Sequence, residues 1–245
     1  MKYIGVDGCA GGWVAVVFRK GSATVVQVFD TFSELWQAHE EARSMLVDMP
    51  IGLPDATMPV RAADMHARSM LGPRKSSVFA PPLRELLDCP DHSQANETSR
   101  QLCGRGISRQ AWNIVSKIRQ VDEVLRRDIN RAKIVREAHP ELCFAALHGA
   151  PMDHYKKTLL GGLDRLHVLQ AHFARSEELL RTSMAAYPRG TLSEDDVLDA
   201  LVLGICASKG RLQSLPESPP LDGCGLPMAI WYHAPESSNF KLNKG

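Results

Sequence analysis

Three strand-like segments in succession, followed by a helix and a fourth apolar segment, constrain the fold of this chain most. The three segments are residues 4–7, 13–19 and 23–29. Glycines between the first two allow a tight return. Thr31 and Glu34 have the spacing of a capping box, and the helix that they begin is expected to reach about Ala42. The fourth segment ends at Asp48. The first three strands can form an antiparallel meander, and the fourth can return parallel to the first through a right-handed crossover.

Helical patterns dominate the rest of the chain. Residues 58–131 are mainly helix and loop, with an amphipathic helix expected over 108–127. A fifth strand precedes Pro140, and a long helical stretch covers about 157–186. The last strong helix pattern begins after Ser193, its expected N-cap.

These patterns predict one α/β domain over residues 1–245. We expect a sheet flanked by helices, with a helical insertion at about 58–131. From about 213 to 245 the chain is rich in Pro, Ser and Gly, which predicts an irregular tail with one strand-like run at 228–232.

The composition is typical of a globular protein, with 44% hydrophobic and 23% charged residues. The net charge is only +1, although residues 60–136 hold 15 Lys and Arg against 8 Asp and Glu. No apolar run approaches the ~18 residues of a membrane span, and the opening segment lacks the apolar region of a signal peptide. Six cysteines without a C-x-x-C pair argue against a zinc site or a disulfide framework. We therefore expect a cytoplasmic protein with no membrane partner.

Acidic residues lie where the predicted elements should meet. Asp7 ends the first strand and Asp48 ends the fourth, so parallel pairing would place both carboxylates at one edge of the sheet. Asp196 and Asp199 share one face of the last helix, and Glu137 lies near the end of the fifth strand. Like charges this close are costly without a cation. Such carboxylates can hold two divalent cations about 3.5–4 Å apart, and oxygen ligands favour Mg²⁺ or Mn²⁺ over zinc.

Each of these acids also has a purely structural explanation. Asp196 could favour the N-terminus of its helix, and Asp48 could begin a turn. Asp7 could cap its own hairpin bend. Glu137 could pair with Arg136 or another base. The metal-site hypothesis depends on the convergence of all the acids and not on any one of them.

Six blocks of sequence together resemble one family. They are IGVDGCAGGWVAV, LVDMPIGLP, ARSMLGPRKSSVFAPP, GISRQAWNIVSKIRQVDEVLR, REAHPELCF and DDVLDALVLG, spread over residues 4–207. The chain is similar to the DUF429 family of predicted nucleases with a ribonuclease H-like fold. The resemblance implies a five-stranded mixed sheet ordered 3-2-1-4-5, in which strand 2 is antiparallel to the others.

The resemblance also implies roles for four aspartates. Asp7 matches the first-strand acid of ribonuclease H-like enzymes, and Asp48 matches the fourth-strand acid, which in those enzymes is often Glu. Asp196 and Asp199 resemble the D-x-x-D of the last helix in RuvC-type resolvases. All four are expected metal ligands and, together with Glu137, expected catalytic residues.

Basic residues supply candidates for substrate binding. Arg74 and Lys75 lie in one loop and suit phosphate contacts, although surface solvation would explain them equally. His139 could assist proton transfer near the metals, or could be structural. Lys156 and Lys157 precede a helix, where lysines are usually solvated, although they could also contact the substrate.

The sequence therefore predicts a metal-dependent hydrolase that cleaves phosphodiester bonds in nucleic acid, DNA or RNA. One alternative is a phosphotransferase or ATPase of the actin and sugar-kinase type. Such proteins open with a similar Asp-Gly hairpin, but they need a second equivalent domain and a second phosphate loop. The other alternative is a non-catalytic binding module that retains the fold.

Overall fold

A five-stranded mixed sheet forms the centre of the protein, whose computed structural model describes residues 1–234. The strands are β1 (Lys2–Cys9), β2 (Gly12–Arg19), β3 (Val25–Phe29), β4 (Ser44–Val47) and β5 (Val135–Glu137). Their order is β3-β2-β1-β4-β5. Strand β2 is antiparallel to β1 and β3, whereas β1, β4 and β5 run parallel. The expected α/β class and strand order are confirmed.

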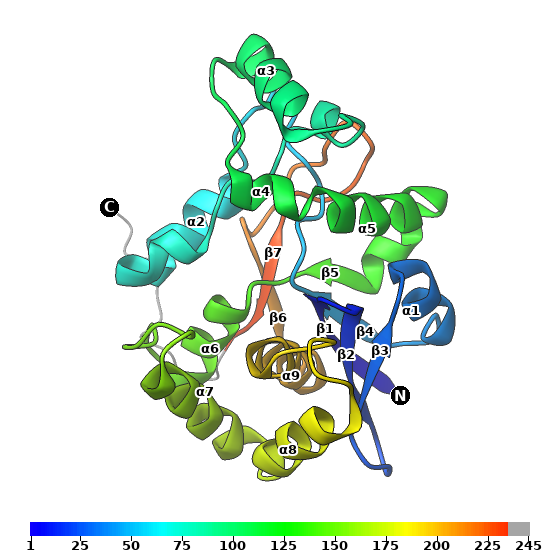
Figure 1. Cartoon of the computed structure of the whole chain (residues 1–245), viewed down its shortest axis with the longest axis vertical. Helices are drawn as coiled ribbons and strands as arrows, with labels where there is room; N and C mark the ends of the chain where they lie inside the picture. Colours follow the sequence, from blue (N-terminus) through cyan, green and yellow to red (C-terminus); the bar gives the residue numbers. More distant parts are fainter. Residues whose placement is uncertain (235–245) are drawn as a thin grey trace.

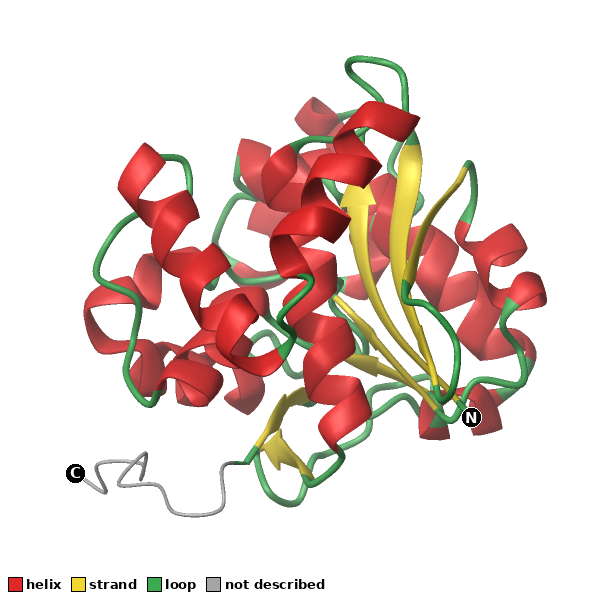
Figure 2. Ribbon diagram, turned by 90° about the horizontal axis from the view of Figure 1, so that it is seen from below, coloured by secondary structure: helices red, strands yellow, loops and turns green. Residues whose placement is uncertain are grey.

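Helices cover both faces of this sheet (Figures 1 and 2). On one face lies α9 (Glu194–Lys209), with α6 (Pro140–His148), α7 (Leu159–His172) and α8 (Ser176–Ala186) packed around it. On the other face lie α1 (Phe32–Ala38) and α5 (Val115–Arg127). Buried apolar side chains form one cluster on each face, because the strand side chains alternate between the two sides.

The central helix α9 lies unusually close to β1. A Cβ atom at Gly5 would lie 2.0 Å from the backbone oxygen of Ala200 and 2.1 Å from the backbone nitrogen of Gly204. Only glycine permits this approach of two backbones. The contact fixes the position of α9 relative to β1.

Helices and loops occupy the segment between β4 and β5. They are α2 (Ala62–Leu71), η1 (Gly72–Ser77), η2 (Arg84–Leu86), α3 (His92–Cys103), α4 (Arg109–Asn113), α5 and η3 (Ile129–Lys133). The single helix expected over 108–127 is interrupted at Ile114, which ends α4 and precedes α5. The helix α3 projects furthest from the sheet (Figure 1).

Three expectations for the second half of the chain were wrong. The helix α6 was not expected, because Pro140 looked like a strand stop but occupies the first turn of a helix, where its missing N–H costs nothing. The helical stretch 157–186 consists of two helices, α7 and α8. The tail is not irregular from 213 onward, since β6 (Leu212–Leu215) pairs with β7 (Ile230–His233); the rest of the expected tail, 235–245, lies outside the described residues.

The pairing of β6 with β7 is stabilised by burial. Ile230 and Tyr232 pack into the same apolar cluster as α9, and Trp231 bridges to Ala138 just beyond β5. Within residues 1–234, no helix combines the length and apolar character that crossing a membrane requires.

Candidate metal centre

Three aspartates from separate elements converge at one edge of the sheet. Asp7 lies in β1, Asp48 directly follows β4, and Asp199 lies on α9. One carboxylate oxygen from each lies within 4.8 Å of the other two. The structure thus brings together three of the four aspartates expected as metal ligands.

The backbone explains this convergence. The amide of Asp48 donates a 2.9 Å hydrogen bond to the carbonyl of Val6, which continues the parallel pairing of β4 with β1 and places Asp48 beside Asp7. The amide of Gly8 donates to Asp7 Oδ1 at 2.7 Å and fixes that carboxylate. The close packing of α9 on β1 brings Asp199 to the same point.

The three carboxylates are costly to ionise together. Asp199 is 1% exposed and Asp7 is 9% exposed. Burial, reinforced by the charges of Asp48 and Asp199, raises the pKa of Asp7 well above its ordinary value. Burial also raises the pKa of Asp48, and it raises that of Asp199 to about 6. A cation among the three oxygens would remove this repulsion.

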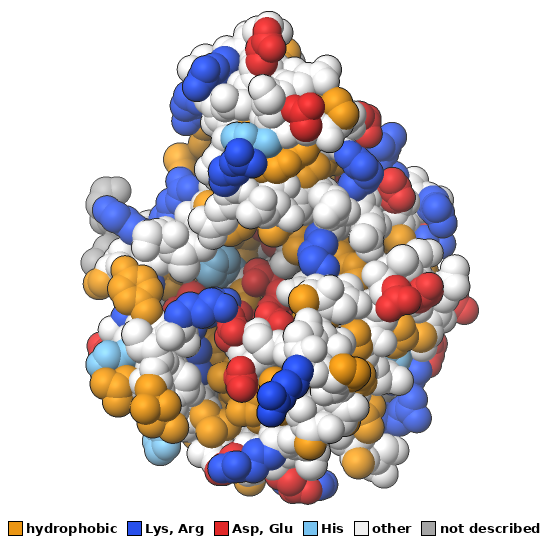
Figure 3. Space-filling model, in the orientation of Figure 1, with side chains coloured by type: hydrophobic (Ala, Val, Ile, Leu, Met, Phe, Trp, Pro, Cys, Tyr) orange, Lys and Arg blue, Asp and Glu red, His pale blue; other side chains and the backbone are white. Residues whose placement is uncertain are grey.

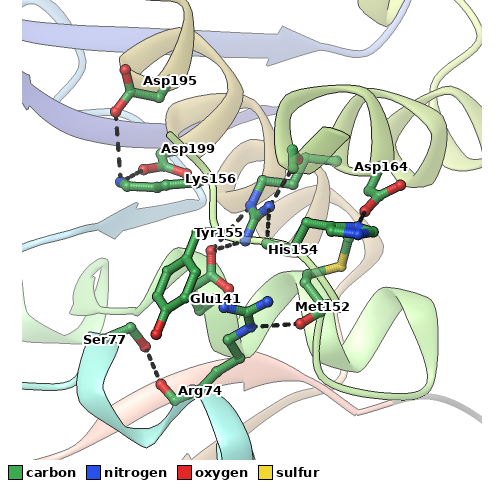
Figure 4. Close-up of polar contacts among 12 residues, drawn as sticks. Arg74, Ser77, Glu141, Met152, His154, Tyr155, Lys156, Asp164, Asp195 and Asp199 are labelled. Carbon is green, nitrogen blue, oxygen red and sulfur yellow. Dashed lines mark hydrogen bonds and ion pairs between the residues drawn. The ribbon is translucent and has the colours of Figure 1, made fainter. Parts of the chain in front are cut away.

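A lysine already meets this cluster. Figure 4 shows Lys156, from the loop before α7, reaching Asp199, and the Lys156 Nζ to Asp199 Oδ2 distance is 2.5 Å. Burial opposes the charged form of Lys156, but the attraction of Asp199 outweighs it, and the pKa of Lys156 is raised. The other oxygen, Asp199 Oδ1, is buried without a hydrogen-bond partner among residues 1–234.

Asp196 does not join the three carboxylates. The amide of Ser193 donates a 2.8 Å hydrogen bond to Asp196 Oδ2, and the two residues form a capping box at the start of α9. The expected direct metal ligation by Asp196 therefore gives way to helix capping. Its negative charge still acts on the site, because it contributes to the raised pKa of Asp7.

Glu137 is engaged elsewhere, so its expected catalytic role is corrected. Both its oxygens accept hydrogen bonds from Arg61, at 2.6 and 2.8 Å, and Arg61 also binds Asp64 at 2.7 Å. Burial raises the pKa of Glu137 to about 7 although Arg61 opposes the shift. The amide of Ile51 donates to Glu137 at 2.7 Å, so this buried network holds the loop after β4.

The two basic residues expected to bind phosphate have different surroundings. Arg74 is buried and donates hydrogen bonds to the carbonyls of Met152 and Asp153, with its guanidinium 4.3 Å from the centre of the Tyr155 ring. Its first role is therefore to hold the loop 149–158. Lys75 is exposed and lines a neighbouring cavity, away from the three aspartates.

His139 lies beside the acidic cluster. Its Nε2 is 3.2 Å from the carbonyl oxygen of Ser77, and its Nδ1 is buried without a hydrogen-bond partner in the described part of the chain. The positive form of His139 would lower the pKa of Asp48, which burial raises. The proton-transfer role considered for His139 stays a prediction.

Asp7 and Asp48 line a cavity of about 450 Å³, and the Asp199 carboxylate lies behind them. Asp7, Asp48, His139, Lys117 and Lys156 are among the residues that line it. Figure 3 shows acidic side chains in a hollow of this face, with Lys and Arg side chains around it. The volume is that of a site for one small molecule or one part of a larger one.

Two lysines of this cavity were not expected to matter. Lys117 lies on α5 with its Nζ 4.8 Å from the centre of the Trp13 ring, and burial lowers its pKa. In the sequence it is one of several basic residues on an amphipathic helix. Lys156 carries no local signal either, because only the path of the loop brings it to Asp199.

Comparison with known proteins gives a family but no activity. A family model described as "Protein of unknown function (DUF429)" matches residues 5–221. A search of curated proteins and a search of solved structures each gave no match.

Proposed function

Because this chain belongs to the DUF429 family, whose description names no activity, we propose its function from the site: a divalent-metal-dependent nuclease that hydrolyses phosphodiester bonds in nucleic acid. The observation that carries the proposal is the meeting of Asp7, Asp48 and Asp199 within 4.8 Å at a cavity that Asp7 and Asp48 line. The three carboxylates carry more negative charge than the neighbouring basic groups balance, and a bound cation would balance the rest. Ionisable groups with pKa values shifted in this way are typical of functional sites.

The donor set fits Mg²⁺ or Mn²⁺. All three side chains offer hard oxygen ligands, which these ions prefer. The buried Asp199 Oδ1 lacks a partner among residues 1–234 and is free to bind a cation. A bound divalent cation would lower the pKa of water and neutralise charge on a phosphate.

Side chains around the cluster match the needs of hydrolysis. Water gives a proton to a base as its oxygen bonds to phosphorus, the bond from phosphorus to the ester oxygen breaks, and the departing oxygen takes up a proton. His139 Nδ1, which has no partner within residues 1–234, can hold a proton beside Asp48. Lys117 and Lys156 present positive charge to a phosphate entering the cavity.

The depth of the aspartates favours a particular form of nucleic acid. A phosphate must enter the cavity to reach the carboxylates of Asp199 and Asp7, which are 1% and 9% exposed. A duplex is stiff over many base pairs, whereas a single strand or a strand end can bend into a pocket. We therefore propose single strands or strand ends, of DNA or RNA, as the substrate.

Cleavage assays on labelled oligonucleotides test the proposal. We expect the protein to cleave some member of a DNA and RNA panel with Mg²⁺ or Mn²⁺ and to lose at least 100-fold in rate on Asp7→Asn or Asp199→Asn, in line with the loss of one key catalytic group. Asp88→Asn is the matched control, because Asp88 is exposed and lies outside the cavity. Cleavage that survives Asp7→Asn unchanged would contradict the proposed site.

A further inference from the structure

The contact between Lys156 and the acidic cluster bears on how many metal ions the site can take. The ammonium of Lys156 lies 2.5 Å from Asp199 Oδ2 and 3.8 Å from Asp195 Oδ2. Asp199 is among the least exposed charged residues of the protein, at 1%. The Lys156 side chain is 37% exposed, so the pair is buried on the carboxylate side only. Removal of Lys156 would leave the buried Asp199 charge without this partner.

The loop holds Lys156 in place from both sides. On one side Tyr155 packs on the guanidinium of Arg74 at 4.3 Å. On the other side Lys157 binds Asp195 at 2.6 Å, and Thr158 caps α7 by accepting from the amide of Gly161 at 3.0 Å. Lys156 is therefore a positioned group, and its place at Asp199 does not depend on the mobility of a free surface side chain.

The charges around the cluster can be counted. Outside the three aspartates, Glu141 is balanced by Arg165 at 2.5 Å, and Asp195 is balanced by Lys157. The negative charge of Asp196 and the positive charge of Lys117 offset each other, and they shift the pKa of the Cys9 thiol in opposite directions. Arg61 with Asp64 and Glu137 leaves one negative charge, which the positive charge of the buried Arg74 offsets.

What remains is the cluster itself. Asp7, Asp48 and Asp199 carry three negative charges when ionised, and Lys156 carries one positive charge. The remainder of two negative charges equals the charge of one divalent cation. A second divalent cation would leave an excess of two positive charges in a buried place, which is costly.

We propose that this centre takes one divalent cation and that the Lys156 ammonium occupies the place of the second cation. The inference rests on the proposed function, since it concerns the same three aspartates. It replaces the two-metal arrangement considered from the sequence with one metal ion and one fixed lysine.

The Lys156 ammonium and a divalent metal ion differ in what they can contribute to hydrolysis. Lys156 contributes a positive charge that its 2.5 Å ion pair with Asp199 holds in place. It stabilises negative charge on the phosphate as that charge develops. Lys156 thus acts as a fixed electrostatic group next to the metal position.

Calorimetric titration of the full-length protein with Mn²⁺, together with electron paramagnetic resonance, tests this assignment. We expect one Mn²⁺ per chain for the wild type and for the matched control Lys157→Met. The control removes a neighbouring lysine whose one ion pair within residues 1–234 is with Asp195. We expect two Mn²⁺ and a spin-coupled signal for Lys156→Met, which removes the positive charge and keeps the length of the side chain. Lys156→Arg should return the count to one.

The outcomes separate the inference from the proposed function. Two Mn²⁺ in the wild type, or one in Lys156→Met, would overturn the role of Lys156 while leaving the metal centre intact. No Mn²⁺ bound by any of the proteins would overturn the metal centre and the inference with it. If Lys156→Met does not fold, the wild-type count and that of Lys156→Arg still decide, because the inference requires one ion in each.

Discussion

Asp199 shows at the residue scale why this site needs a cation. Its pKa of about 6 lies above the ordinary value of 3.8 because of burial, so the folded protein holds this proton more tightly than the unfolded chain does. Stability of the metal-free protein must therefore fall as pH rises from about 4 through 6, by about 3 kcal/mol from this residue. The same ionised carboxylate becomes a ligand when a divalent cation is present.

This gives a prediction for pH dependence. Melting temperatures measured between pH 4 and 8 with a chelator should fall with pH, and the fall should be shallower in Asp199→Asn. Added Mn²⁺ should restore the wild type at the upper end of this range and have little effect on the variant. Glu137, whose pKa burial raises to about 7, contributes equally to both proteins and so does not affect the comparison. Identical slopes of melting temperature against pH in the two proteins would show that ionisation of Asp199 does not destabilise the metal-free protein.

Arg61, in contrast to Asp199, has a role that was not evident from the sequence. It joins Asp64 and Glu137 inside the protein, and Glu137 lies 76 positions later in the chain. Local sequence shows Arg61 only as a basic residue near a helix start. Pairings between distant residues in a low-dielectric interior depend on the complete fold, so sequence patterns alone did not reveal this one.

Replacing Arg61 tests this structural role. Arg61→Met leaves Glu137 and Asp64 buried without their partner, and we expect a loss of about 3–5 kcal/mol in the free energy of unfolding. Urea denaturation measures the loss, with Arg127→Met, at an exposed position of α5, as the control. A change as small as that of the control would mean that Glu137 is free for another role.

Among the secondary-structure elements, the central sheet and α9 were predictable and several helices were not. Alternating and continuous apolar segments identified the strands, and the Ser193 cap with the apolar run after it identified α9. Pro140 misled because the same residue can stop a strand or begin a helix. The strand-like run expected at 228–232 overlaps β7, but β6 was missed because short segments pair only when burial supports them.

The contact between β1 and α9 carries a prediction at this scale. In Gly5→Ala the added Cβ meets backbone atoms of α9, so the helix must move and carry Asp199 away from Asp7. We expect a loss of about 1–3 kcal/mol in the free energy of unfolding, as for overpacked cores, and weaker Mn²⁺ binding. Calorimetry and urea denaturation measure both effects.

Gly162→Ala is the matched control for that change. A Cβ at Gly162 on α7 would have no neighbour within 4 Å, so alanine should be neutral or stabilise the helix by up to about 1 kcal/mol. Mn²⁺ binding unchanged in Gly5→Ala would show that the position of α9 does not set the geometry of the site.

At the scale of the whole molecule, topology explains the part of the site that could be predicted. Parallel pairing of β1 with β4 and the packing of α9 bring Asp7, Asp48 and Asp199 together. The strand pattern predicted the pairing of β1 with β4, and the family resemblance implied the complete strand order. The contributions of Lys156 and Arg74 were not readable, because they depend on the path of the loop 149–158. Element ends followed from periodicity, whereas loop positions followed from the packing of the entire chain.

The enclosed cavity gives a prediction about substrate form. Because Asp7 and Asp48 line a cavity of about 450 Å³, single-stranded oligonucleotides should be cleaved at least 10-fold faster than blunt duplexes of the same sequence. Duplexes with frayed or overhanging ends should fall between the two. Equal rates on single strands and blunt duplexes would contradict the view that the phosphate must enter this cavity.

Anomalous X-ray diffraction from crystals of the protein grown with Mn²⁺ tests the central claim most directly. We expect one anomalous peak per chain, in contact with carboxylate oxygens of Asp7, Asp48 and Asp199, with the Lys156 ammonium still beside Asp199. Peaks only at other positions, or none despite saturating Mn²⁺, would contradict the account.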